Sequence, residues 1–211
     1  MEEEVLNTRE LILEVAKKEF LEKGFKNASL RNICKTAGVS TGAVYGYFKD
    51  KDSIFTALVS DAMYGIKELI NKIEGEEAAS NIADLFGTRK DIENLVIMHN
   101  EYIDYIYDNF EEFKLLIVCS GGSSVETFIE DLAKYIGSID ILRIDILKEK
   151  GIFIDDFVIH MIVKFYITSI CELVEHNIPR EDAVKYISTL STFFFAGWAE
   201  LLKKANLIPE N

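Results

Sequence analysis

Residues 38–55, with the sequence GVSTGAVYGYFKDKDSIF, bring together side chains that can hold phosphate oxygens. Proteins use hydroxyl groups, ammonium groups and the free N–H groups at the start of a helix for this purpose. Small residues in the first turn would also allow the backbone to approach a partner closely. The side chains concerned are Ser40, Thr41, Gly42, Tyr45, Tyr47, Lys49 and Lys51. The alternative is that the tyrosines are half-buried core residues and the lysines belong to a solvated face.

A pair of short helices is expected to position these side chains. Ser29 can cap a helix over 30–37, and Ser40 can cap another over 41–48. Gly38 lies between them and suits a tight turn, because glycine adopts a positive φ readily. Two short helices joined by a glycine turn form a helix-turn-helix.

A longer helix is expected to precede this pair. Asn7 can cap it, with Glu10 at the capping-box spacing, and Ile12, Ala16 and Phe20 lie at helical intervals behind the cap. Gly24 is expected to stop the helix in a left-handed conformation. The N-terminal segment is therefore predicted to contain three helices.

Charge is unevenly distributed along the chain, whose formal net charge is -13 at pH 7. Residues 8–51 carry nine basic and five acidic side chains, whereas the net acidity lies beyond residue 55. A phosphate-rich partner would attract the first segment and repel the rest. The charge pattern thus places polyanion binding at the N-terminal end.

The remaining sequence is also predicted to be helical, because the chain has only 2 prolines and its apolar residues recur at helical spacing. The three cysteines, Cys34, Cys119 and Cys171, are too few and too widely spaced to indicate a disulfide framework. We find no signal peptide and no uncharged stretch long enough to cross a membrane. We therefore expect a cytoplasmic protein without a membrane partner.

Residues 8–55 resemble the N-terminal DNA-binding domain of the TetR family of transcriptional regulators. The resemblance rests on KGF at 23–25, SLRNICKTAGVS at 29–40 and TGAVYGYFKDKDSIF at 41–55. It implies an all-α fold of about nine helices. A three-helix helix-turn-helix DNA-binding domain, residues 1–50, would be followed by a helical ligand-binding and dimerisation domain, residues 51–211.

The resemblance assigns the expected DNA contacts to numbered residues. Phosphate contacts would fall on Ser29, Tyr45, Tyr47 and Lys51, and base contacts on Arg31, Thr41, Gly42 and Tyr45. Ser40 and Lys49 are added as phosphate contacts from the chemistry of their side chains. A solvated charge on a helix face is the alternative for Arg31. Gly46 departs from the family, which often has a larger side chain there.

The stretch STFFFAGWAELL, residues 191–202, predicts a dimer interface near the C-terminus. Aromatic residues anchor interfaces, and small residues between them permit close helix approach. The resemblance likewise implies a homodimer built from the last two helices. Its candidate residues are Phe193, Phe194, Gly197 and Trp198, with ordinary core packing within one chain as the alternative.

A pocket for a small molecule is expected among the central helices. Tyrosine and histidine side chains among aliphatic residues can orient a mostly apolar ligand through a few hydrogen bonds. The candidates are His99, Tyr102, Ile106, Phe128, His160 and Tyr166, and plain core packing is the alternative for each. The histidines show no metal-ligand spacing, so neither a metal nor a cofactor is expected.

These observations favour a DNA-binding transcriptional regulator. The resemblance implies more specifically a homodimeric repressor that a small-molecule effector releases from its double-stranded operator. A DNA-bound factor that recruits another protein and senses no ligand is one alternative. A helical enzyme is the other, but we find no nucleophile motif, phosphate loop or acid–base pair. No catalytic residues are therefore expected.

Overall fold

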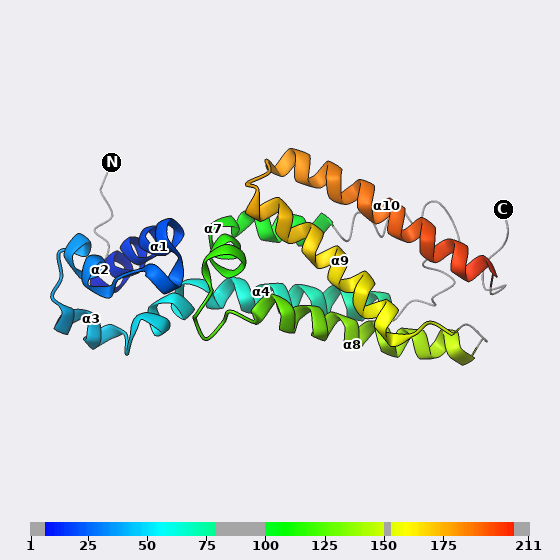
Figure 1. Cartoon of the computed structure of the whole chain (residues 1–211), viewed down its shortest axis with the longest axis horizontal. Coiled ribbons are helices and arrows are strands. Elements are labelled where there is room, and N and C mark those ends of the chain that lie inside the picture. Colours follow the sequence, from blue (N-terminus) through cyan, green and yellow to red (C-terminus); the bar gives the residue numbers. More distant parts are fainter. Residues whose placement is uncertain (1–6, 79–99, 150–152, 205–211) are drawn as a thin grey trace. The chain divides into compact units, whose positions relative to one another are not determined.

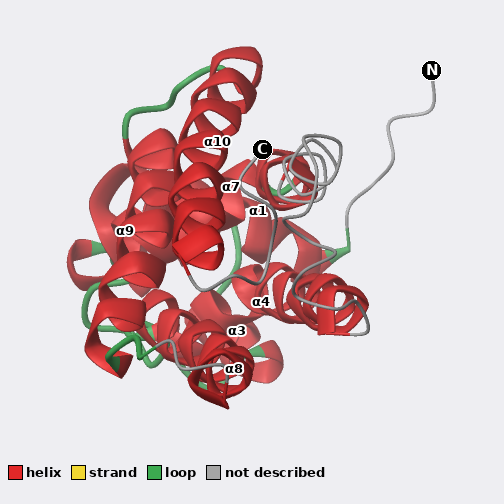
Figure 2. Cartoon of the chain, turned by 90° about the vertical axis from the view of Figure 1, so that its right-hand side faces the viewer, coloured by secondary structure: helices red, strands yellow, loops and turns green. Residues whose placement is uncertain are grey.

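The computed structural model of the chain describes residues 7–78, 100–149 and 153–204. Within these ranges the chain consists of helices and connecting loops, without a strand (Figure 2). The prediction of an all-α fold is confirmed. The elements, labelled as in Figure 1, are α1 (Thr8–Asn27), α2 (Leu30–Ala37), α3 (Thr41–Tyr47), α4 (Lys51–Ala78), a helix over 100–108, α7 (Phe110–Lys114), the π-helix η1 (Leu115–Cys119), α8 (Phe128–Glu149), α9 (Asp156–Glu175) and α10 (Arg180–Lys204).

The chain divides into two compact units by its internal packing. The first unit contains residues 1–64 and 109–129, and the second contains residues 65–108 and 130–211. The first unit therefore takes in a segment distant in sequence. These units are defined by packing. The boundary after residue 50 between a DNA-binding and a ligand-binding domain stays a prediction.

The helix starts in the first unit are capped as predicted. Asn7 and Glu10 form a reciprocal capping box, in which each side chain accepts from the other residue's N–H at 3.1 Å. Ser40 caps α3 by accepting from the N–H of Ala43 at 3.1 Å. Gly38 adopts the left-handed conformation, with φ 66° and ψ 25°, at the turn between α2 and α3. Local hydrogen bonding thus defines the helix-turn-helix.

Gly24 departs from the expected left-handed stop. Its φ is 71°, but its ψ of 161° is extended, and α1 is only kinked there and continues to Asn27. The N–H of Ala28 then closes the last turn on the carbonyl of Gly24 at 3.1 Å. The positive φ explains why glycine is suited to this position. The regular helix is interrupted at Gly24 as predicted, but one further turn, ending at Asn27, follows the kink.

The core of the first unit is built around three phenylalanine rings. Phe20 and Phe55 meet edge to face with their centroids 5.0 Å apart, and Phe25 and Phe55 do so at 5.3 Å. The helix α1 contacts α2, α3 and η1 around this cluster. Lys17 on α1 adds an ion pair to Glu112 on α7 at 2.6 Å. The segment 109–129 is thereby part of the same core as the N-terminal helices.

Polar contacts within the second unit join the 100–108 helix to the start of α10. The Tyr107 hydroxyl donates to the carbonyl oxygen of Ile178 at 2.7 Å. Arg180 bonds Asp104 and Asp108 through its two terminal nitrogens, each at 2.7 Å. These bonds fix the turn between α9 and α10.

The helix α9 is, among the described helices, the one that is long and apolar enough to cross a membrane by length and composition. The core helix of a soluble protein meets the same criterion.

Candidate nucleic-acid interface

The short helix α3 presents two different faces. Val44 is 1% exposed and Phe48, just past the helix, is 5% exposed, so this side anchors the helix in the core. Tyr45 and Tyr47 are 56% and 52% exposed on the other side. Thr41 and Gly42 in the first turn are exposed as well. The predicted contact residues of α3 are therefore on the surface rather than beneath other side chains.

The first turn of α2 adds two further exposed candidates, Ser29 and Arg31. Ser29 is the N-cap of α2, and its side chain accepts from the N–H of Asn32 at 3.4 Å. Ser40 and Lys49 are also exposed, at the two ends of α3. The short segment 29–49 thus offers hydroxyl, guanidinium and ammonium groups to solvent.

Lys51 differs from the other candidates. Its ammonium group donates to the carbonyl oxygens of Phe25 at 2.6 Å and Ala28 at 3.0 Å, and it lies 4.4 Å from the centre of the Phe25 ring. Burial lowers the pKa of Lys51 below its usual value. These bonds hold the end of α1. The phosphate contact expected of Lys51 stays a prediction, and in this structure its ammonium group is bonded to the backbone.

Glu19 was not singled out in the sequence, and it is the buried charge nearest to this surface. Only 6% exposed, it accepts from Lys23 with both carboxylate oxygens at 3.0 Å, from the N–H of Ser29 at 3.1 Å and from the Asn32 side chain at 2.6 Å. Burial alone would raise the pKa of Glu19, but these bonds outweigh it and lower the pKa. Its acidic side chain among the apolar residues of α1 was the sequence feature that could have indicated a buried charge.

The predicted ligand-pocket residues are only partly brought together. Tyr102 and Ile106 are buried one turn apart on the 100–108 helix of the second unit. Tyr166 is half-buried on α9, whereas His160 is exposed and stacks on Phe157 at 6.1 Å. Phe128 is buried in the first unit, and His99 lies outside the described residues. The pocket stays a prediction.

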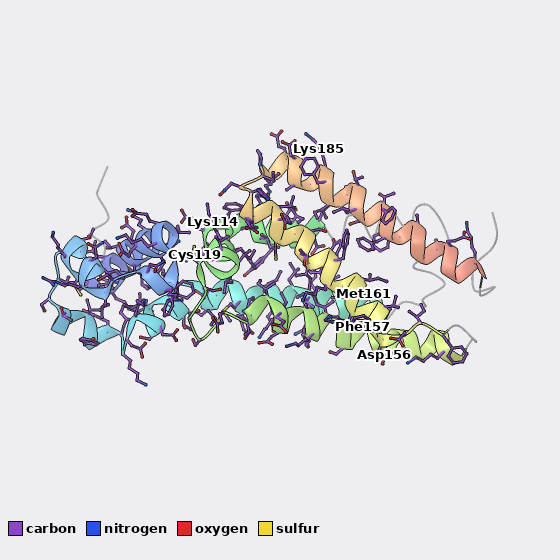
Figure 3. The ribbon with its side chains drawn as sticks, viewed as in Figure 1. Lys114, Cys119, Asp156, Phe157, Met161 and Lys185 are labelled. Carbon is purple, nitrogen blue, oxygen red and sulfur yellow. The ribbon has the colours of Figure 1, made fainter. Side chains whose placement is uncertain are left out.

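An apolar surface runs along α9 and α10, which contact each other in the second unit (Figure 1). Phe157, Met161 and Phe165 follow one another at four-residue intervals on α9 and are 64%, 50% and 54% exposed. Figure 3 labels Phe157 and Met161 on this helix. Phe193 on α10 is 73% exposed. We call these four residues the aromatic face.

The other predicted interface residues lie close to the aromatic face in sequence. Phe194 is half-buried and packs edge to face on Phe165 at 5.5 Å and Tyr166 at 5.9 Å. Gly197 is exposed on α10. Trp198 is within α10, but its side chain lies outside the described part of the structure. The apolar surface thus extends beyond the predicted stretch to α9.

Metal and cysteine chemistry contribute little to this geometry. No three His, Cys, Asp or Glu side chains gather as a metal site requires within the ranges that the structure describes. The three cysteines are free thiols; Cys34 and Cys119 are buried, and Cys171 is half-buried.

The N-terminal segment is similar to known regulators in sequence. Residues 12–58 match the family model described as bacterial regulatory proteins, tetR family. The segment is 41% identical over 69 residues to the HTH-type transcriptional regulator AcrR of Shigella flexneri, covering 32% of each chain. It is 39% identical over 67 residues to the HTH-type transcriptional repressor BepR of Brucella suis biovar 1, again covering 32% of each. The match therefore spans about a third of these relatives' length.

Solved structures extend the likeness in fold to most of the chain. A transcriptional regulator from Aquifex aeolicus superposes with a TM-score of 0.60 at 18% identity, over 89% of this chain and 99% of that one. The regulator PfmR of Thermus thermophilus gives 0.57 at 19% identity, over 89% and 95%. At these identities the structures show a shared fold.

The matched proteins are transcriptional regulators and not enzymes. The sequence match covers the helix-turn-helix with its exposed polar residues, and the fold match covers nearly all of the rest. Residues 12–58 thus carry the helix-turn-helix segment of the tetR family of bacterial regulatory proteins, and the chain shares the fold of solved transcriptional regulators.

Proposed function

We propose that this protein is a homodimeric repressor that binds a double-stranded DNA operator and leaves it when a small molecule binds. The observation that carries the DNA-binding part is the division of α3 into a buried side and an exposed side. Val44 and Phe48 anchor it, while Thr41, Gly42 and Tyr45 are free to enter a groove. A helix placed in this way by a helix-turn-helix reads base edges in the major groove.

We distinguish contacts to the bases from contacts to the phosphates on this surface. Thr41, Gly42, Tyr45 and Arg31 are the proposed base contacts. Arg31, Thr41 and Gly42 lie in the first turns of α2 and α3, and Tyr45 lies one turn further along α3. Ser29, Ser40, Tyr47 and Lys49 are the proposed phosphate contacts. Phosphate contacts fix the register on the duplex and carry little sequence information. The local excess of basic residues over 8–51 supports the approach to DNA.

Dimerisation is supported by the aromatic face. Four large apolar side chains exposed on α9 and α10 form an unusual surface for a soluble monomer, and such surfaces commonly mark interfaces. A second copy of the chain would cover the face and bring two heads to one duplex. Two half-sites spaced by about one helical turn or a multiple of it would then be bound together. A cytoplasmic location follows from this function.

The proposed release by a ligand rests on the resemblance to the TetR family and on the sequence. Tyr102 and Ile106 lie buried in the second unit, as lining residues would, and Tyr166 is half-buried on α9. A ligand that binds the DNA-free form better must weaken DNA binding by the same factor by which DNA weakens ligand binding. Such couplings are typically worth about 1–3 kcal/mol.

The test of the whole proposal is selection of bound duplexes from a random pool by the full chain, followed by sequencing. The proposal predicts enrichment of one sequence with two inverted half-sites. A screen of small molecules for release of that duplex then addresses the effector. A pool that stays unenriched at low salt would overturn the DNA-binding function. A single unrepeated site would instead overturn the dimeric arrangement.

A further inference from the structure

The peptide bond between Ala28 and Ser29 is held between two opposite charges. Its carbonyl oxygen accepts from the ammonium nitrogen Nζ of Lys51 at 3.0 Å, and its N–H donates to the carboxylate oxygen Oε1 of Glu19 at 3.1 Å. Both groups belong to one rigid peptide plane. A cation on one edge and an anion on the other therefore fix the orientation of that plane.

The same two side chains also hold the segments on either side of this peptide. Lys51 donates to the carbonyl of Phe25, in the last turn of α1, at 2.6 Å. Glu19 accepts through its other oxygen, Oε2, from the side chain of Asn32, in the first turn of α2, at 2.6 Å. The end of α1 and the start of α2 are thus tied to one pair of charges, which we call the peptide clamp.

The clamp is stiff because Glu19 is almost fully removed from solvent. Its side chain is 6% exposed, so its charge depends on the donors of Lys23, Ser29 and Asn32. Taking one donor away from a buried carboxylate leaves an uncompensated charge, which is strongly unfavourable. Rotation of the Ala28–Ser29 peptide would do this, so the geometry of the junction is narrowly determined.

We propose that Glu19 and Lys51 are positioning residues for DNA binding, which through the Ala28–Ser29 peptide set the start of α2 against the duplex. The inference rests on the proposed function. The N–H of the clamped peptide belongs to Ser29, and Arg31 lies two residues further on in the first turn of α2, so a change in the peptide's orientation moves both. Glu19 is buried and acidic, and it acts without contacting DNA.

The substitution Glu19→Gln separates this role from simple electrostatics. Loss of a negative charge by itself would strengthen binding to the DNA polyanion. The clamp predicts weaker binding instead. The NH₂ group of the glutamine would face the donors of Lys23, Ser29 or Asn32, and the Ala28–Ser29 peptide would no longer be held by a carboxylate. We expect binding of the selected duplex to weaken by about tenfold, as a small misplacement of a contact group does.

Two controls accompany Glu19→Gln. Glu22→Gln removes the same charge from an exposed position on the same helix and should leave binding unchanged or slightly tighter. Ile12→Val lowers stability in the core without touching the clamp and should leave the affinity of the folded protein unchanged. Equal affinity of Glu19→Gln and Glu22→Gln for the duplex would overturn the inference.

Lys51→Met tests the other half of the clamp and keeps its apolar stem beside Phe25. A lysine that contacts phosphate contributes to the salt dependence, so its loss would reduce the slope of log K against log salt by about 1. The clamp predicts binding weakened by about tenfold with an unchanged slope. A slope reduced by about one would instead make Lys51 a phosphate contact and overturn its positioning role.

The double variant tests whether the two residues act through one peptide. Residues that serve one unit give non-additive effects, so the loss in Glu19→Gln/Lys51→Met should be close to that of a single variant. A loss equal to the product of the two single losses would show independent roles and contradict the clamp.

A spectroscopic readout keeps the clamp testable apart from DNA. In the ¹⁵N–¹H spectrum, the Ser29 amide proton of the native protein should lie downfield, as expected for an N–H bonded to a carboxylate, and should move upfield in Glu19→Gln but not in Glu22→Gln. An unmoved Ser29 signal would overturn the clamp. A native protein that binds no duplex but shows this shift would overturn the proposed function and leave the clamp as a purely structural feature.

Discussion

Lys49 and Lys51 carry the same charge and lie two positions apart, yet their environments differ. Lys49 is exposed beyond α3, whereas Lys51 donates hydrogen bonds to the backbone carbonyl oxygens of Phe25 and Ala28. The spacing of the sequence predicts a pair of phosphate-binding lysines and has no means of distinguishing them. The distinction comes from the end of α1, whose carbonyl groups lie within reach of one ammonium group only.

Replacing Lys51 by alanine should therefore destabilise the protein. Two buried or half-buried carbonyl groups would lose a charged donor, at a cost of about 1–3 kcal/mol in the free energy of unfolding. Lys49→Ala is the matched control and should change it by less than about 0.5 kcal/mol, as surface substitutions usually do. Urea denaturation measures both. Equal stabilities of the two variants would show that the carbonyl contacts contribute nothing.

Acid should reveal the contribution of Glu19 to stability. The bonds from Ser29, Lys23 and Asn32 lower its pKa in the folded state although burial opposes them. A carboxyl group with a lowered folded pKa stabilises the protein above its unfolded pKa of about 4.3 and loses this effect as the pH falls through the folded value. The difference in unfolding free energy between the native chain and Glu19→Gln should thus be constant near neutrality and shrink below about pH 4.3. A difference that stays the same down to about pH 3 would contradict the hydrogen-bond assignment.

Cys171 should react slowly despite being half-exposed. Burial, followed by the charges of Glu172 and Glu175, raises the pKa of its thiol to about 11. At about pH 8 only about one thiol in a thousand is then a reactive thiolate. Alkylation by iodoacetamide, followed by mass spectrometry, should proceed far more slowly at Cys171 in the native protein than in urea. Equal rates in the two conditions would rule out this environment.

Secondary-structure elements were predictable from the sequence where local bonds define them. The caps of Asn7, Ser29 and Ser40 and the turn at Gly38 need only neighbours a few residues away. The interruption at Gly24 was placed correctly. The further turn that ends at Asn27 was not expected, because its closing bond from Ala28 depends on the packing of that turn. The π-helix Leu115–Cys119 has no local signature and was expected as ordinary helix.

Packing, rather than sequence alone, determines which of the phenylalanines is exposed to a second copy of the chain. Three consecutive phenylalanines at 193–195 all suggest an interface, but they point to different surroundings. Phe195 is buried, Phe194 packs on Phe165 and Tyr166, and Phe193 is 73% exposed. The residue best placed to contact a second copy is therefore Phe193.

Phe193→Glu should separate the proposed dimer while leaving the fold of each chain intact. A charge in the centre of an apolar interface should raise the dimer dissociation constant by at least about a hundredfold. Sedimentation velocity measures the change. Phe194→Glu is the comparison, and we expect it to lower the melting temperature as well, because that ring packs within one chain. An unchanged dimer in Phe193→Glu would place the interface elsewhere.

For the molecule as a whole, the sequence predicted the class of fold and the location of the polar surface. It could not predict contacts between distant segments, such as the bond from Tyr107 to Ile178 or the ion pair from Lys17 to Glu112. These depend on how helices far apart in sequence pack. Of the DNA-binding residues predicted from the sequence, all but Lys51 lie exposed in the structure. Their placement was predictable because they belong to one short local motif.

The net negative charge of the chain limits the surface that can bind DNA. A chain with a net charge of -13 should bind DNA only through a restricted surface, because its remaining surface repels phosphate. The small set of basic and hydroxyl residues on α2 and α3 must then carry most of the affinity. Single substitutions on α3 should have correspondingly large effects.

The most direct test of the account compares the affinity of native protein and Thr41→Ala for the selected duplex and for a random one. Fluorescence anisotropy at fixed salt measures the two dissociation constants, whose ratio is the specificity. If the exposed side of α3 reads the bases, Thr41→Ala should lower this ratio by about tenfold, the loss expected for one base contact, and leave random-duplex binding unchanged. A native protein with equal affinity for both duplexes, or a Thr41→Ala variant with an unaltered ratio, would contradict the assignment of α3 as the recognition helix.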